Sequence, residues 1–394
     1  MRWRDLPDLA VRTRGGSAVA ANDETFAEKE NLIRAEGPAY QPHTFGHHGQ
    51  LMDGWETRRR RQPGHDWVIV RLGVPGIVHG VVADTSWFTG NYPPECSVEA
   101  AYVDPLARPA AGVELFDLVD WEEIVPRSAV AGDTENAFDV HHDRLVTHVR
   151  LRIYPDGGVA RLRVHGEPVG DPRWVAGRAF DLAAMEHGGR IEDCSNRFYS
   201  SPDNLLAPGP ARVMGEGWET SRRRDAGNDW VVVDLAAEGV VEGVEIDTTC
   251  FIGNAPGEAT LTALDEPVSV VLPRTRLQRD SVNRFLLGTG RPARRLRVDI
   301  YPDGGLARFR AVGTPTAAGR AALFLRWYDR LPDSAAVAVM TGWGEADETW
   351  AEALAAERPY GSGERLHAAV PGLAGRAPDR AAWERLAGLP RNDR

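Results

Sequence analysis

The amino-acid sequence predicts a mainly β protein made of two tandem β-sandwich domains with a short α-helical appendage at the C-terminus. Three observations lead to this prediction. The chain contains a long internal repeat, each copy holds short Val- and Ile-rich runs separated by turn residues, and the last part of the chain changes to Ala-rich sequence with helical spacing.

The internal repeat is the most specific of these observations. Gly54–Trp67 reads GWETRRRRQPGHDW and Gly217–Trp230 reads GWETSRRRDAGNDW, and the two agree at ten of fourteen positions at a shift of 163 residues. The IYPDGG motif that begins at Ile153 recurs at Ile300, a shift of only 147 residues. The second copy therefore lacks sixteen residues between these motifs, and a surface loop is the cheapest place for that deletion.

With 394 residues, of which 42% are hydrophobic, the chain is long enough for two or three domains that each bury a core. We expect an N-terminal leader at 1–16, a first copy at 17–166, a linker at 167–189, a second copy at 190–313 and a helical tail at 318–394.

Short apolar runs within the first copy predict strands at 67–72, 77–83, 146–153 and 159–164, because Gly, Pro, Asn and Asp lie between them. The Tyr-Pro-Asp-Gly-Gly segment fits a tight turn, so we expect it to join the last two runs as a hairpin. Many short strands in each copy favour an antiparallel jelly roll. In the tail, Leu323, Trp327 and Leu331 recur at helical spacing.

The formal net charge of -11 argues against a nucleic-acid or anionic-membrane binder, because a polyanion would be repelled. The sequence has no apolar run long enough for a spanning helix and no apolar segment behind the N-terminal arginines, so we expect a soluble cytoplasmic protein without a membrane partner. Three cysteines without CxxC spacing suggest neither a disulfide framework nor a thiolate zinc site.

The arginine runs of the repeated motif, 58–61 and 222–224, have two interpretations. Guanidinium groups bind carboxylates bidentately, but a solvated or internally paired cluster is equally compatible with the pattern. Trp55, Trp67, Trp218 and Trp230 flank the charges and are expected to pack in the cores. Two further repeated pairs, Asp84/Asp247 and Asn91/Asn254, either close turns or line a site.

Histidines are distributed unequally between the copies. Nine of the eleven lie in the first copy and none lies between 190 and 313, so only the first copy can supply an imidazole that titrates near neutral pH. His43, His47 and His48, or His141 and His142, could also mimic the spacing of metal ligands. The sequence requires no cofactor, a divalent metal remains an alternative, and the metal ligands are unknown.

The doubled GWET-Arg-rich-DW motif, with its Asp-Thr and Gly-Asn companions, resembles the allantoicase family over about residues 15 to 315. The resemblance implies tandem jelly rolls similar to galactose-binding domains, and hydrolysis of allantoate to ureidoglycolate and urea in purine (ureide) catabolism. Carried over by motif, it implies a set of site residues in both copies: Glu56, Arg59, His65, Asp66, Asp84 and Asn91, and Glu219, Arg222, Asp229, Asp247 and Asn254. This chain departs from the family pattern at Asn228, where a histidine is usual.

Release of intact urea requires cleavage between a ureido nitrogen and the central carbon, so the departing nitrogen must be protonated and water supplied. One hypothesis has Arg59 or Arg60 holding the carboxylate, His65 or Glu56 acting as general acid or base, and Asp66 and Asn91 hydrogen-bonding the ureido groups. Elimination to an imine followed by hydration is equally compatible with the sequence.

The tail from about 323 to 370 resembles the start of the ureidoimidazoline (OHCU) decarboxylase family through Trp350 and Glu357-Arg358-Pro359-Tyr360, and it stops before that family's catalytic histidine region. We expect a homo-oligomer, because ligand sites often lie at domain or subunit boundaries. The rival is a non-catalytic tandem carbohydrate-binding protein, since a fold does not fix a function.

Overall fold

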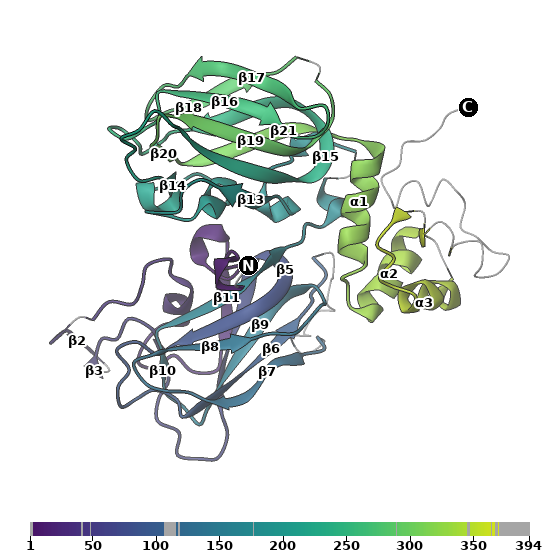
Figure 1. The fold of residues 1–394 in the computed structure, drawn as a ribbon. Coiled ribbons are helices and arrows are strands. Elements are labelled where there is room, and N and C mark those ends of the chain that lie inside the picture. Colours follow the sequence, from purple (N-terminus) through teal and green to yellow (C-terminus); the bar gives the residue numbers. More distant parts are fainter. Residues whose placement is uncertain are drawn as a thin grey trace. The chain divides into compact units, whose positions relative to one another are not determined.

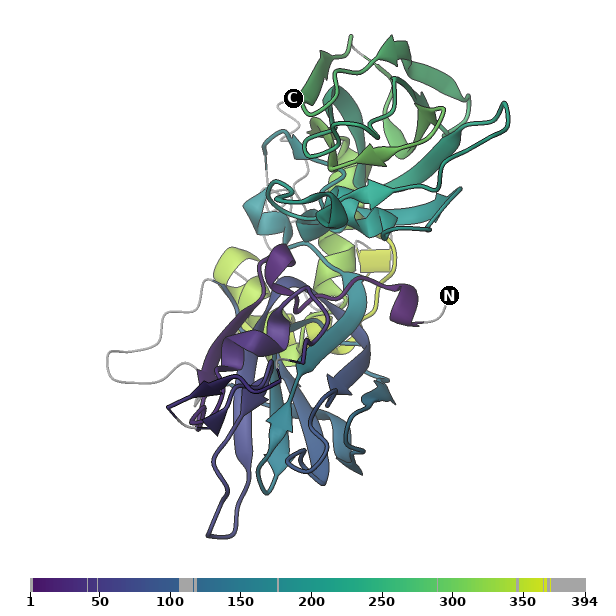
Figure 2. The same ribbon diagram turned by 90° about the vertical axis from the view of Figure 1, so that its left-hand side faces the viewer.

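The computed structural model describes residues 3–40, 42–47, 49–105, 116, 119–175, 177–288, 290–344, 347–363, 365–366 and 369. The chain forms two compact units, Met1–Glu167 and Pro168–Arg394. In Figures 1 and 2 the strands of the first unit run from purple to blue-teal, and those of the second from teal to green.

The first unit contains three short 3-10 helices and eleven strands among its described residues: η1 (Trp3–Asp5), η2 (Arg12–Arg14), η3 (Lys29–Ile33), β1 (Ser17–Ala21), β2 (Phe45–Gly46), β3 (Gly49–Gln50), β4 (Trp55–Glu56), β5 (Asp66–Asp84), β6 (Glu95–Ala101), β7 (Glu122–Ala129), β8 (Glu135–Asp139), β9 (Val146–Tyr154), β10 (Gly158–Val159) and β11 (Arg161–Pro168).

The second unit repeats this order and then adds helices: η5 (Pro172–Trp174), β12 (Phe180–Asp181), η6 (Met185–His187), β13 (Arg190–Cys194), η7 (Pro202–Leu206), η8 (Met214–Glu216), β14 (Trp218–Glu219), β15 (Asp229–Asp247), β16 (Glu258–Ala263), β17 (Ser269–Arg276), β18 (Val282–Leu286), β19 (Ala293–Tyr301), β20 (Gly305–Leu306), β21 (Arg308–Pro315), α1 (Ala317–Tyr328), α2 (Asp333–Gly344) and α3 (Glu348–Ala356).

One long strand in each unit belongs to both layers of the sandwich. The first part of β5 pairs antiparallel with β1 and β9 in the order β1-β5-β9-β6-β7, and its second part pairs with β8, while β11 also pairs with β5. In the second unit β15 pairs first with β13 and β19 and then with β21 and β18. A strand that bends from one sheet into the other is a common way to form the corner of a β-sandwich.

This arrangement confirms the β-sandwich prediction but corrects two of its details. The strands expected at 67–72 and 77–83 are one strand, β5, because the chain between them bends without reversing. The turn after Tyr154 does not close a hairpin: β9 pairs with β5 and β6, whereas β10 pairs with β4 and β11 pairs with β5. The turn therefore carries the chain from one sheet to the other.

The two glycines of this turn have separate roles. Gly157 has φ 143°, a conformation that residues with a Cβ rarely adopt. Gly158 lies against the ring of Phe88, where an added Cβ would be 2.0 Å from a ring carbon. Gly304 (φ 129°) and Gly305, where an added Cβ would be 1.9 Å from a ring carbon of Phe251, repeat both features in the second unit. The Gly-Gly sequence is thus required by the backbone and by packing.

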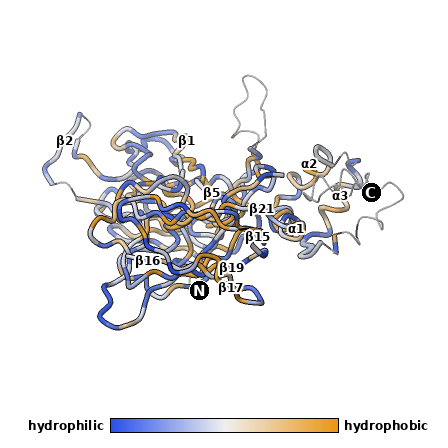
Figure 3. The backbone as a smooth tube through the Cα atoms, turned by 90° about the horizontal axis from the view of Figure 1, so that it is seen from above, coloured by the Kyte–Doolittle hydropathy of each residue, from blue (hydrophilic) through white to orange (hydrophobic). Residues whose placement is uncertain are grey.

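Each sandwich buries an apolar core between its layers. In β9, Val149, Leu151 and Ile153 point inward and are fully buried, and Arg150 and Arg152 point to the outer face of the sheet. Figure 3 colours much of the tube around β5 and β15 orange, for apolar residues, whereas several peripheral loops are blue.

Trp55 and Trp218 occupy equivalent core positions and are fully buried. Their Nε1 atoms donate hydrogen bonds of 2.8 Å to the carbonyls of Asp23 and Asn196, so neither polar atom is left unpaired. The expectation that all four repeated tryptophans pack in the cores is wrong for Trp67 and Trp230. Each is the second residue of its strand, between two buried neighbours, so its side chain points to the outer face and is half-buried.

The ends of the two copies are integrated into the units. Residues of the expected leader pack in the first unit: Leu9 is fully buried and its N–H donates to the carbonyl of Val164 at 2.7 Å. Residues expected as a linker form β12, which pairs with β21. Thr316 caps the first helix of the tail by accepting a hydrogen bond from Gly319 N at 2.9 Å. Within the described ranges, no helix is long and apolar enough to span a bilayer.

Candidate active site

A carboxylate–amide pair lies at the loop end of each sandwich. Glu56 ends β4, and Asn91 lies in the loop after β5; the Asn91 amide donates to Oε1 of Glu56 at 2.8 Å. Asn254 donates in the same way to Oε1 of Glu219 at 2.6 Å. Burial raises the pKa of Glu56, and the hydrogen bond from Asn91 opposes that shift only in part. Glu56 therefore holds a proton to higher pH than an exposed glutamate.

An arginine–aspartate pair lies beside the same turn in each unit. Nη1 of Arg60 contacts Oδ1 of Asp66 at 2.5 Å, and Arg60 N donates to Asp156 in the turn. Asp66 is 1% exposed. Its counterpart Asp229 is fully buried and contacts Nη1 of Arg223 at 3.0 Å. Removal of one member of such a buried pair typically costs about 3–5 kcal/mol, because it leaves an uncompensated charge.

Each of these aspartates also has an unused oxygen. Oδ1 of Asp66 accepts a second hydrogen bond from Asn22, and Oδ1 of Asp229 accepts one from Ser195. Oδ2 of both aspartates is buried and has no hydrogen-bond partner among the described residues. Both oxygens could accept a hydrogen bond from a bound N–H group or water.

His65 precedes Asp66 and packs its ring against Tyr154 at a centroid distance of 5.2 Å. Burial, followed by the positive charges of Arg152, Arg60 and Arg150, lowers the pKa of His65. The imidazole is therefore neutral at neutral pH and can accept a proton. In the second unit this position is Asn228, which donates to Asp299 at 2.9 Å and cannot titrate.

Asp84 and Asp247 close turns at the ends of the long strands. Oδ1 of Asp84 accepts from the N–H and hydroxyl of Ser86 at 2.9 and 2.6 Å, and Oδ1 of Asp247 accepts from Thr249 N at 2.8 Å. The residues that follow Ser86 and Thr249 have a strained backbone, since Trp87 has φ 70° and its counterpart Cys250 has φ 73°. Asp133 and Asp280 hold these two residues by accepting from their N–H groups at 2.8 and 2.9 Å. Strain of this kind often marks functional loops.

The arginines of the two runs differ in whether they already have an ion-pair partner. Arg59 and Arg222 are exposed and form no hydrogen bond or ion pair with the described residues. Arg223, the counterpart of Arg60, was missed by sequence reasoning, which selected Arg222 from the second run. The constant shift of 163 residues was the signal that could have found it.

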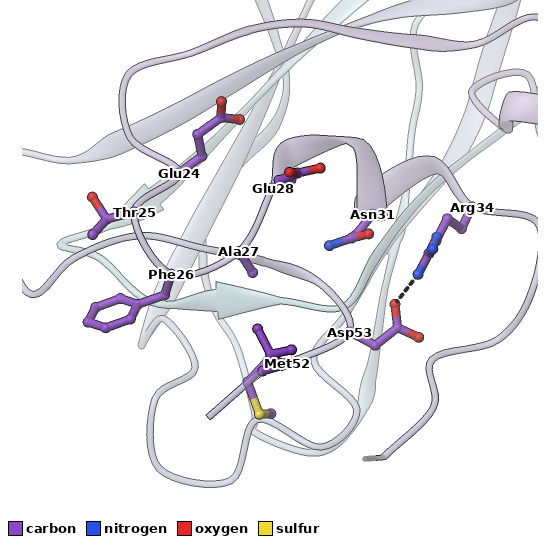
Figure 4. Close-up of a pocket in the computed structure, with 10 residues that line it drawn as sticks. Glu24, Thr25, Phe26, Ala27, Glu28, Asn31, Arg34, Met52 and Asp53 are labelled. Carbon is purple, nitrogen blue, oxygen red and sulfur yellow. Dashed lines mark hydrogen bonds and ion pairs between the residues drawn. The ribbon is translucent and has the colours of Figure 1, made fainter. Parts of the chain in front are cut away.

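The first unit contains a cavity of about 510 Å³, and Figure 4 shows the residues that line it. It is lined by Glu24, Thr25, Phe26, Ala27, Glu28, Asn31, Arg34, Leu51, Met52 and Asp53. Ala27 forms an antiparallel bridge with Glu56, which ties the cavity wall to the pair. Arg34 reaches Asp53 across its mouth at 3.1 Å. The volume is typical of small-molecule sites, although none of the residues proposed from the sequence lines this cavity.

The histidine clusters suggested by the sequence do not form a metal site among the described residues. Across the described part of the chain, no three side chains of His, Cys, Asp or Glu gather as metal ligands would. His48 lies outside the described residues. All three cysteines are free thiols.

Sequence reasoning also missed a repeated aromatic–cation contact next to this site. The guanidinium of Arg127 lies 4.2 Å from the Tyr154 ring centroid and bonds Glu95, and that of Arg274 lies 4.0 Å from Tyr301 and bonds Glu258. The members are far apart in sequence, so only the combined shifts of 163 and 147 residues could have linked them.

The two units thus define a tandem β-sandwich protein with matched polar sites on its loop ends. The allantoicase repeat family model matches residues 7–169 and 180–316. A probable allantoicase of Nocardia farcinica is 53% identical over 79% of this chain and 95% of its own length. A probable allantoicase of Streptomyces coelicolor is 46% identical over 82% of this chain and 91% of its own.

The crystal structure of allantoicase from Saccharomyces cerevisiae is also similar, with a TM-score of 0.68 and 32% identity over 78% of this chain and 93% of the yeast chain. On this evidence the chain belongs to the allantoicase repeat family.

Proposed function

We propose that this protein is an amidine hydrolase that converts allantoate to ureidoglycolate and urea. The observation that carries the proposal is the family match across both copies, with relatives named probable allantoicases that it covers almost completely. The duplicated Glu–Asn and Arg–Asp pairs supply the polar groups such a substrate needs. This evidence favours the hydrolase over a carbohydrate-binding protein.

The directions of the two pKa shifts suggest separate roles for Glu56 and His65. Glu56 retains its proton to higher pH and is suited to protonate the departing ureido nitrogen. His65 is neutral and is suited to take a proton from the attacking water. Both residues flank the turn that follows Tyr154, since Glu56 pairs with Gly158 and His65 packs on Tyr154.

The open acceptor oxygen of Asp66 is proposed to bind a ureido N–H group, and Asn91 to orient Glu56. The same roles fall to Asp229 and Asn254 in the second copy, which has no histidine at the position of His65. We therefore propose that the first copy dominates catalysis. We also propose that no metal is required and that the protein works in the cytoplasm.

The test is urea release by the purified protein with allantoate. Urea and ureidoglycolate should form in equal amounts, and activity should survive exhaustive treatment with a chelator. A Glu56→Gln variant purified in parallel controls for contaminating host enzymes, because removal of the acid should cost about 10²-fold or more in kcat. Wild-type protein that releases no urea would refute the proposal.

A homo-oligomer is proposed on the basis of exposed aromatic residues in the second unit. Phe198 and Tyr199 pack edge to face at 4.7 Å and are 70% and 64% exposed. Exposed apolar patches on proteins often mark subunit interfaces. A strict monomer by light scattering at assay concentrations would contradict this proposal.

A further inference from the structure

The outer face of the first sheet carries an excess of positive charge beside His65. Arg150 and Arg152 both contact Glu99: Nε of Arg150 lies 2.5 Å from Oε2, and Nη2 of Arg152 lies 3.0 Å from Oε1. Two guanidinium groups thus share one carboxylate. Nε of Arg152 is buried and has no hydrogen-bond partner within the described ranges.

The residues around Arg152 form a polar, partly buried cluster on the outer face of the sheet. Trp67 and Ser97 are its cross-strand neighbours on β5 and β6. The Ser97 hydroxyl and the Tyr154 hydroxyl lie 3.0 Å apart, and Tyr154 packs on His65. The side chains of Arg150, Arg152 and Glu99 are 20%, 28% and 11% exposed, so they are desolvated but still reachable.

The second copy has different residues at all three corresponding positions, and two of these residues bond to each other. Applying the two repeat shifts, His65, Glu99 and Arg152 correspond to Asn228, Thr262 and Asp299. There Asp299 accepts from Arg297 at 2.8 Å and from Asn228 at 2.9 Å, and Arg297 stacks on Trp230 at 4.6 Å. One arginine meets one carboxylate, so that face is neutral and its groups satisfy each other.

We infer that the cluster around Arg152 and Arg150 in the first copy is the site that binds the carboxylate of the substrate. The inference rests on the proposed function for the identity of the substrate, an α-ureido carboxylate. Arg60 is unsuited to this role because Asp66 already neutralises it, and Arg59 is exposed to solvent and its competing water. A carboxylate beside the exposed part of the Arg152 guanidinium would balance the surplus charge.

Kinetics with Arg152→Gln test the inference. Loss of a charge-assisted hydrogen bond is expected to raise KM for allantoate by about 10-fold or more, with a much smaller change in kcat. Arg297→Gln, at the counterpart of Arg150 in the second copy, is the control and should leave KM within about 2-fold. Thermal melting of both variants shows whether either substitution disturbs the fold.

Binding of an unreactive probe separates this inference from the proposed function. Ureidoacetate, which keeps one ureido group and the carboxylate, should bind wild-type protein by calorimetry and lose about 10-fold or more in affinity in Arg152→Gln. Its neutral amide should bind both proteins equally. If wild-type protein released no urea but bound ureidoacetate through Arg152, the proposed hydrolysis of allantoate would be refuted. The proposed carboxylate site at Arg152 would still be supported.

The opposite result would overturn the site alone. Wild-type urea release with an unchanged KM and unchanged ureidoacetate affinity in Arg152→Gln would show that the carboxylate binds elsewhere. Arg59→Gln, assayed alongside, should leave KM within about 2-fold; a 10-fold rise in KM for that variant would place the carboxylate at the exposed run instead.

Discussion

The amide of Asn91 donates a hydrogen bond to Glu56 from a loop 35 residues further along the chain, and Asn254 bonds Glu219 across the same separation. The sequence alone did not predict that Glu56 contacts Asn91 or that Glu219 contacts Asn254. It showed only that each of these residues recurs in both copies. Asn91 lowers the pKa of Glu56 against the effect of burial.

Asn91→Ala is therefore expected to raise the pKa of Glu56 further, because the opposing hydrogen bond is lost. If Glu56 works as the acid, the alkaline limb of the pH profile of kcat moves to higher pH, while kcat falls through loss of orientation. Asn254→Ala is the matched control and should leave the limb in place. A shift to lower pH in Asn91→Ala would exclude Glu56 as the acid.

His65→Asn gives the first copy the residue that the second copy has naturally. We expect kcat to fall by about 10²-fold or more, since general acid–base assistance is typically worth about 10²- to 10⁴-fold. Asn228→His should change kcat far less, although it loses the bond to Asp299. Full activity in His65→Asn, measured together with its thermal midpoint, would end the case for the first copy as the catalytic one.

His148 should make the first unit sensitive to acid. Burial, then the charge of Arg71, lowers the pKa of His148 to about 4 from the ordinary value of 6.5. Between these values the unfolded chain binds a proton that the folded chain does not, so stability falls as pH falls through this window. The loss is about 2–3 kcal/mol by pH 4.5.

His148→Gln should flatten the dependence of the unfolding free energy on pH between 6.5 and 4.5. His142 and His187 also have lowered pKa values because they are buried, so the curve becomes shallower and not flat. Denaturant titrations at several pH values measure the effect. An identical slope in the variant and the wild type would show that folding does not lower the pKa of His148.

Arg161 is a buried structural cation whose loss should be costly. It is 1% exposed and donates to the carbonyls of Glu36, Asp53 and Ala160 and to the Asp53 carboxylate at 2.8 Å. Arg161→Met should destabilise the first unit by about 3–5 kcal/mol, because it leaves the three carbonyls without their donor and leaves Asp53 with the exposed Arg34 as its remaining ion-pair partner.

Two other arginine variants serve as comparisons for the stability of Arg161→Met. Arg308 donates to three carbonyls at the equivalent place in the second unit, so Arg308→Met should also be strongly destabilising. Arg59→Met, on the exposed run, should change the unfolding free energy by less than about 0.5 kcal/mol. A small effect for Arg161→Met would mean that water replaces the guanidinium at these acceptors.

Local features of the sequence were sufficient to predict the two sandwiches and the first tail helix. The repeat predicted two equivalent units, the apolar run at 146–153 predicted a strand, and Leu323 and Trp327 recurred at helical spacing. Each of these patterns reflects which residues of a single element are buried. The spacing of apolar residues along the sequence shows this directly.

The path of the chain between the sheets was not predictable in the same way. A turn with Pro and Gly suits both a hairpin and a crossing between layers, and only long-range pairing of β9 and β11 decides between them. For the same reason the ion pairs of Glu99 with Arg150 and Arg152 could not be predicted from the sequence, since these partners are about fifty residues away.

The bent strands β5 and β15 have a consequence for how each sandwich comes apart. A layer cannot detach while the other stays intact, because both layers hydrogen-bond to one continuous backbone. The amides of Val68, Val70, Val231 and Val233, which lie in the ladders of these strands, should exchange with deuterium only through opening of a whole sandwich. Each sandwich should therefore open as a single cooperative unit, and partial opening should be confined to the loops that carry Asn91 and Asn254.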